Sequence, residues 1–75
     1  MRRFTTINDL VNYLFEVDHG FRDDLTDEQM RDIAQTHRTN RYEEITDSEI
    51  DAMLVAAYMA TGADETTALA MLRNR

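Results

Sequence analysis

Two octets of closely similar sequence, DDLTDEQM at residues 23–30 and EEITDSEI at residues 43–50, constrain the fold of this chain more than any other feature. In each octet a threonine is followed three residues later by Gln or Glu. This is the spacing of a capping box, in which the two side chains bind each other's backbone amides. Aliphatic residues stand just before each threonine and four residues after it, as in a hydrophobic staple. Each octet therefore predicts a helix start, at Thr26 and at Thr46. The sequences that follow the octets differ, so we do not interpret them as a duplicated unit.

Apolar periodicity predicts two further helices. Between residues 7 and 15 the apolar side chains fall at the i, i+3, i+4, i+7, i+8 positions of an amphipathic helix. Gly20 and Gly62 are expected to end helices in the left-handed conformation, and Asp64 to cap a last helix. The chain has no proline and no linker-like segment, so residues 1–75 are expected to form one domain.

We predict an all-α fold, a small bundle of three main helices plus a short C-terminal fourth helix. The predicted helices span about residues 6–18, 27–38, 47–61 and 65–73. The expected core consists of Leu10, Leu14, Phe15, Ile33, Ile50, Met53, Leu54, Tyr58 and Leu72. A chain of this length without cysteine has no disulfide to stabilise it, so thin stability and self-association are both expected.

Charge narrows the class of partner. The chain has 15 acidic and 8 basic residues, a net charge of −7, and every base is arginine. Such a chain repels a nucleic-acid backbone overall and favours a basic surface of another protein. No stretch approaches the roughly 20 apolar residues of a membrane span, so a cytoplasmic protein without membrane contact is expected.

Catalytic and metal-binding patterns are weak. Ser48 is the sole serine, at a helix start where serines form local hydrogen bonds, and neither cysteine nor lysine offers a nucleophile. His19 lies near Asp18 and Asp23, but their spacing matches no known set of metal ligands. We therefore expect no enzyme, no catalytic residues, no metal and no cofactor.

The acidic residues of the octets allow two interpretations. They stabilise the positive ends of helix dipoles, but several also stand four residues apart, where like charges destabilise a helix by a few tenths of a kcal/mol. Solvated capping regions are one interpretation, and an acidic docking face is the other. The residues expected to bind protein are Asp24, Glu28, Asp32, Glu43, Glu44, Asp47 and Asp51.

An acidic docking face would make this a small non-catalytic protein-binding module. Two helix starts lined with carboxylates would imitate the phosphate rows of nucleic acid and occlude a basic, nucleic-acid-binding surface of a host protein. Inhibitors encoded by phages and plasmids are similar in size and charge, which is an analogy and not a family assignment.

Two alternatives remain open. The third predicted helix is apolar nearly all round, so a homodimer could form through Ala52, Val55, Ala56 and Met59. The second alternative is DNA binding, because LTDEQMRDIAQTHRT resembles the first helix of a helix-turn-helix. Its locally basic residues are Arg31, His37, Arg38 and Arg41. However, a recognition helix should follow, and the next helix begins among five carboxylates that would repel phosphates.

Overall fold

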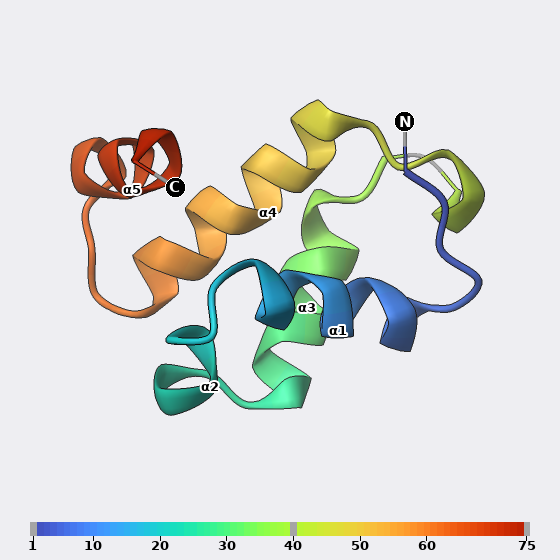
Figure 1. Ribbon diagram of the computed structural model, residues 1–75, viewed down its shortest axis with the longest axis horizontal. Coiled ribbons are helices and arrows are strands. Elements are labelled where there is room, and N and C mark those ends of the chain that lie inside the picture. Colours follow the sequence, from blue (N-terminus) through green and yellow to red (C-terminus); the bar gives the residue numbers. More distant parts are fainter. Residues whose placement is uncertain (1, 40, 75) are drawn as a thin grey trace.

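The computed structural model describes residues 2–39 and 41–74, most of which lie in helices (Figure 1). Along the chain these are α1 (Ile7–Val17), α2 (Phe21–Asp24), α3 (Asp27–His37), the 3-10 turn η1 (Tyr42–Glu44), α4 (Asp47–Ala60) and α5 (Glu65–Arg73). The described residues contain no β-strand, so the predicted all-α class is confirmed. The four longer helices lie on the four predicted segments, whereas α2 and η1 were not predicted.

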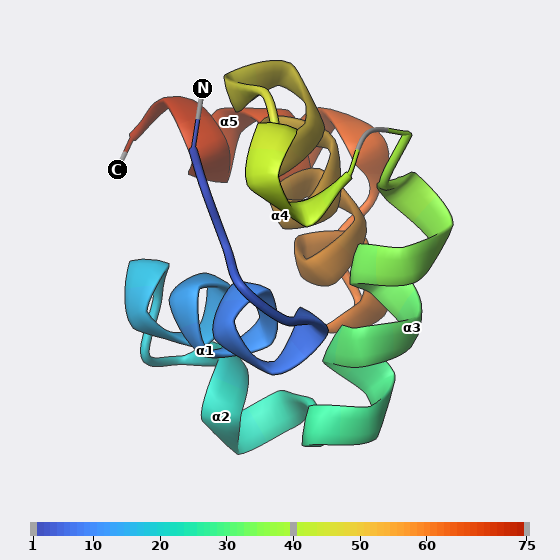
Figure 2. The same ribbon diagram turned by 90° about the vertical axis from the view of Figure 1, so that its right-hand side faces the viewer.

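The helices α1, α3 and α4 pack on one another, and α5 packs on α4 (Figures 1 and 2). Their shared core contains seven of the nine residues expected there, while Ile33 and Leu72 are half-buried. Among the described residues, eight more are buried in the core and were not predicted to lie there. Several are small or lie near the ends of helices. They are Val11, Phe21, Leu25, Met30, Ala34, Ile45, Ala57 and Ala68.

Both predicted capping boxes are present. At the start of α3, Gln29 N donates to Thr26 Oγ1 at 3.1 Å, and Thr26 N donates to Gln29 Oε1 at 2.8 Å. At the start of α4, Glu49 N donates to Thr46 Oγ1 at 3.2 Å, and Thr46 N donates to Glu49 Oε1 at 3.1 Å. The staple residues that flank each box are buried. The octets are therefore helix starts, as their sequences predict.

The N-terminal segment lies beside η1 and the start of α4. Arg2 N donates to Ile45 O at 2.7 Å, Ile45 N donates to Arg2 O at 3.1 Å, and Phe4 N donates to Tyr42 O at 2.8 Å. Arg2 and Ile45 form an isolated antiparallel bridge. This pairing covers Ile45, which is fully buried, and joins the N-terminal segment to the residues just before α4.

The two glycines behave differently. Gly62 has φ 116° and ends α4 in a Schellman-type turn, in which Gly62 N donates to Met59 O and Ala63 N to Tyr58 O. Gly20 was expected to be left-handed as well, and this was wrong, because its φ is −61° and it is the N-cap residue that precedes α2. The carboxylate of Asp18 sets this local path, since it accepts from Gly20 N at 2.9 Å. Its other oxygen accepts from the Tyr58 hydroxyl at 2.8 Å, which ties the end of α1 to α4.

Candidate functional site

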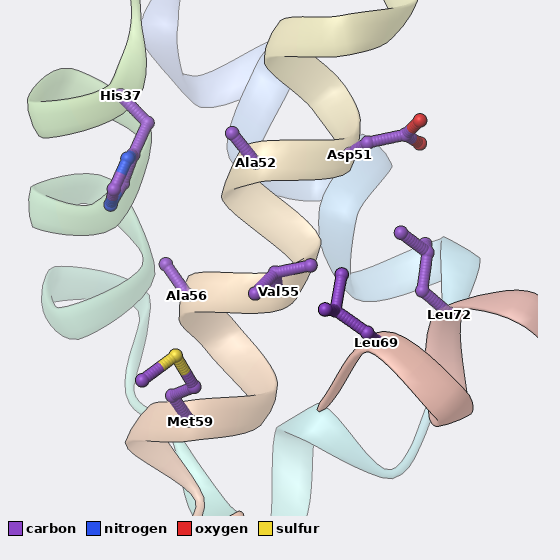
Figure 3. A pocket seen from close by; sticks show the side chains of 8 residues that line it. All are labelled: His37, Asp51, Ala52, Val55, Ala56, Met59, Leu69 and Leu72. Carbon is purple, nitrogen blue, oxygen red and sulfur yellow. The ribbon is translucent and has the colours of Figure 1, made fainter. Parts of the chain in front are cut away.

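An apolar groove runs along the outer side of α4, between α3 and α5 (Figure 3). Its volume is about 450 Å³. The lining residues are His37 from α3, Asp51, Ala52, Val55, Ala56 and Met59 from α4, and Leu69 and Leu72 from α5. The four residues predicted for a dimer interface, at positions 52, 55, 56 and 59, therefore lie together in one groove.

The groove exists because α4 has more apolar surface than its neighbours cover. Its buried face, which includes Ile50, Met53 and Leu54, packs into the core, and the groove lies on the other side of the helix. The helix α5 covers this second side in part, since Ala68 is its one buried residue. Met59 and Leu69 stay 43% and 37% exposed, although large apolar side chains with this exposure are few in the described part of the chain.

Four of the predicted acidic residues surround the beginning of α4. Glu43 and Glu44 lie in η1, Asp47 and Asp51 lie one turn apart on α4, and all four are exposed. Asp51 also lines the groove. The acidic group and the apolar groove are therefore continuous.

The intramolecular partners of these carboxylates are weak. Asp47 Oδ1 lies 3.9 Å from Arg2 Nε, and Glu43 Oε2 lies 3.6 Å from Arg41 Nε. Exposed ion pairs at such distances contribute little, at most about 1 kcal/mol. Among the described residues, Asp51 forms no side-chain hydrogen bond or ion pair. Most of the negative charge at this end of the molecule therefore faces solvent.

The other predicted acidic residues, Asp24, Glu28 and Asp32, are exposed but lie elsewhere. The first turn of α3 is at the bottom of Figures 1 and 2, whereas the first turn of α4 is at the top. The reason is that α3 runs from the bottom of the molecule to the top, and residues 38–46 lead from its end to the beginning of α4 there. The structure thus contains two separate acidic groups, and the seven residues do not form one face.

One carboxylate of the second octet, that of Glu49, does not contribute to the exposed negative charge. Its side chain is buried, with 7% of its surface exposed. Besides closing the capping box, it accepts from Thr46 Oγ1 at 3.1 Å and, through Oε2, from Thr39 N at 2.8 Å. This carboxylate therefore joins the connection after α3 to the start of α4 and is unavailable to a partner. The spacing of the capping box was visible in the sequence, but the third donor at Thr39 was not.

The arginines of the helix-turn-helix-like segment are engaged within the chain. Arg31 Nη2 donates to Asn8 Oδ1 at 3.1 Å, and the Arg38 guanidinium lies 4.1 Å from the centre of the Tyr42 ring. Residues 38–46, including η1, separate α3 from α4. This connection is longer than the short turn of a helix-turn-helix, and it leads into exposed carboxylates.

The part of the chain that the structure describes has no cluster of three or more histidine, aspartate or glutamate side chains arranged to hold a metal ion. None of its helices combines the length and the apolar character needed to cross a membrane. The pKa of Asp64 is lowered mainly by a hydrogen bond from the backbone N–H of Thr67 and, to a smaller extent, by one from the Thr67 hydroxyl. This residue caps α5, so its altered pKa reflects helix capping.

Comparisons of the chain with protein-family models, with curated proteins and with solved structures gave no match. The function proposed below therefore depends on the geometry of the described residues.

Proposed function

We propose that this protein is a non-catalytic cytoplasmic module that binds a basic surface of another protein and occludes it. The contact surface is the acidic group at the beginning of α4, formed by Glu43, Glu44, Asp47 and Asp51. A basic surface that normally binds nucleic acid is the expected target, because these carboxylates present negative charge as phosphates do. The action would be that of an inhibitor or modulator.

One observation supports this proposal above the others. The four carboxylates are exposed at one end of the molecule, and the two whose ion pairs are known meet their arginines only at 3.6 and 3.9 Å. A helix start needs one or two acids to complement its dipole, and additional exposed acids add repulsion. A cationic partner relieves that repulsion when it binds. The attraction between opposite charges also accelerates the association of the two proteins.

Affinity capture from cells of the source organism tests the proposal. The wild-type protein is compared with a variant that carries both Glu43→Arg and Asp47→Arg. We expect the wild type to retain a basic protein and to block the binding of nucleic acid to it. The double variant should lose most of this binding, because two attractions become two repulsions.

A second double variant, Glu28→Arg with Asp32→Arg, is the matched control. It changes the net charge by the same amount, also reverses an acid in a first helical turn, and lies in α3, outside the acidic group at the beginning of α4. Far-UV circular dichroism verifies that both variants are folded. If the control variant loses the partner and the first variant keeps it, the acidic group at α4 is not the contact surface.

A homodimer is the second candidate, and the groove along α4 favours it. Ala52, Val55, Ala56 and Met59 line this groove together, and an apolar surface that solvent reaches is a common site of association. Sedimentation equilibrium at several concentrations distinguishes the two candidates. A strict monomer at roughly micromolar concentration would exclude the homodimer.

A further inference from the structure

We propose that the groove along α4 receives an amphipathic helix of the partner protein, with lysine or arginine beside the apolar stripe of that helix. This inference rests on the proposed function, because it specifies which element of the basic partner enters the molecule. Helices that bind in grooves do so through apolar residues at i, i+3, i+4 and i+7.

Small side chains on the floor of the groove allow another helix to approach closely. Ala52 and Ala56 lie one turn apart on α4 and lack side chains that would hold another helix away (Figure 3). Met59 lies beyond them along α4, and Leu69 stands to the side on α5. Helices pack 8–10 Å apart depending on the side chains between them, so a floor of alanines permits close approach.

The walls of the groove can adapt to what enters it. Methionine has an unbranched, flexible side chain that adjusts to different apolar shapes, and Met59 lies at the surface. The wall formed by α5 is held mainly through its contact with α4. A helix that inserts beside Leu69 and Leu72 would bury apolar surface that α5 alone leaves exposed.

Charge decides between a partner helix and a second copy of this chain. Asp51 lines the groove, and Asp47 lies one turn before it on the same helix. A second copy bound through the same groove would bring its own Asp51 and a further net charge of −7, and the lining that it would present contains neither arginine nor lysine. A cationic helix instead pairs with Asp51 while its apolar residues exclude water, which strengthens that attraction.

Two synthetic helical peptides of about four turns serve as probes, since this length of about 22 Å exceeds the stretch of about 12 Å from Asp51 to Met59 along α4. Both carry leucines at i, i+3, i+4 and i+7. One has arginines beside the leucines at the end that meets Asp51, and the other has glutamates there. Fluorescence anisotropy should show that the arginine peptide binds the wild type at least about tenfold more tightly than the glutamate peptide.

Exchange of charge identifies the contact. Asp51→Arg should reverse the preference, so that the glutamate peptide becomes the tighter ligand. Asp32→Arg makes the same change of charge on α3, outside the groove lining, and should leave the preference of the wild type in place.

Substitutions in the lining test the apolar contact. Ala56→Arg fills the groove with a long charged side chain and should abolish binding of the arginine peptide. Met59→Arg repeats the test at an exposed position, where the fold tolerates the change. Asn12→Arg, which adds the same charge at an exposed position of α1, should leave binding within about twofold of the wild type.

Several results would overturn the inference. These are equal affinity for the two peptides, no binding of the arginine peptide, and binding that survives both Ala56→Arg and Met59→Arg. Dimerisation of the wild type that Ala56→Arg abolishes would also overturn it, by assigning the groove to a second copy.

Failure of the groove inference and failure of the proposed function can be distinguished. The groove inference alone fails if capture of the cellular partner depends on Glu43 and Asp47 but tolerates Ala56→Arg. The proposed function fails if that capture tolerates Glu43→Arg with Asp47→Arg.

Discussion

Gln29 and Glu49 occupy the same position in the two octets and have different roles. Both side chains accept a hydrogen bond from the N-cap amide of their helix. Gln29 is exposed, whereas Glu49 is buried and its carboxylate also accepts a hydrogen bond from Thr39 N. A carboxylate has two accepting oxygens, and an amide has one. The second accepting oxygen of Glu49 therefore allows the additional hydrogen bond from Thr39 N.

Glu49→Gln should lower the free energy of unfolding by about 1–2 kcal/mol, because an amide that keeps the capping box turns its NH₂ group toward Thr39 N–H. Glu49→Ala should lower it by about 2–3 kcal/mol, since it leaves buried donors without acceptors. Urea denaturation measures both values. Glu44→Gln, at an exposed position, should stay within about 0.5 kcal/mol of the wild type. A Glu49→Gln variant as stable as the wild type would show that the bond to Thr39 contributes nothing.

At the scale of elements, local sequence determines where helices begin and end. Thr6, Thr26, Thr46 and Asp64 each accept a hydrogen bond from the third residue of the helix that they cap. These caps and the apolar periodicity were enough to predict the four longer helices, because both are properties of neighbouring residues.

The elements that were missed depend on contacts between distant residues. The helix α2 is a single turn held by Asp18 and by the packing of Phe21, whose ring centre lies 4.7 Å from that of Tyr58. The turn η1 pairs through its backbone with the N-terminal segment. Neither contact leaves a periodic signal in the sequence. The apolar lining of the groove was predicted from α4, but its walls from α3 and α5 required the structure.

The cap of α5 gives a pH dependence that belongs to this element. The lowered pKa of Asp64, below its ordinary value of 3.8, means that its ionised form is favoured by folding. Its contribution to stability is therefore present above the unfolded pKa and is lost as the pH falls through the lower, folded pKa. Asp64→Asn retains a capping side chain that does not titrate.

The difference in unfolding free energy between the wild type and Asp64→Asn should therefore be constant above about pH 5 and shift against the wild type as the pH falls further. Urea denaturation at a series of pH values measures this difference. A difference that does not change down to about pH 2 would contradict the role assigned to the Asp64 carboxylate.

For the whole molecule, the path of the chain determines how charge is distributed. The chain passes along α3 from one end of the molecule to the other before α4 begins, so the acidic starts of these two helices lie at opposite ends. The prediction of a single acidic face did not take this path of the chain into account. The group at α4 adjoins an apolar groove through Asp51, whereas none of Asp24, Glu28 and Asp32 lines that groove. A combined acidic and apolar surface thus exists at one end of the molecule.

The central claim is that a partner binds at the beginning of α4 and along its groove, and not at the beginning of α3. Amide chemical-shift mapping of the isotopically labelled protein, with the captured partner added, tests this claim most directly. The predicted perturbations fall on residues 43–59 and 69–72, while residues 24–32 stay unchanged. Perturbations centred on residues 24–32, with α4 and α5 unaffected, would contradict the account.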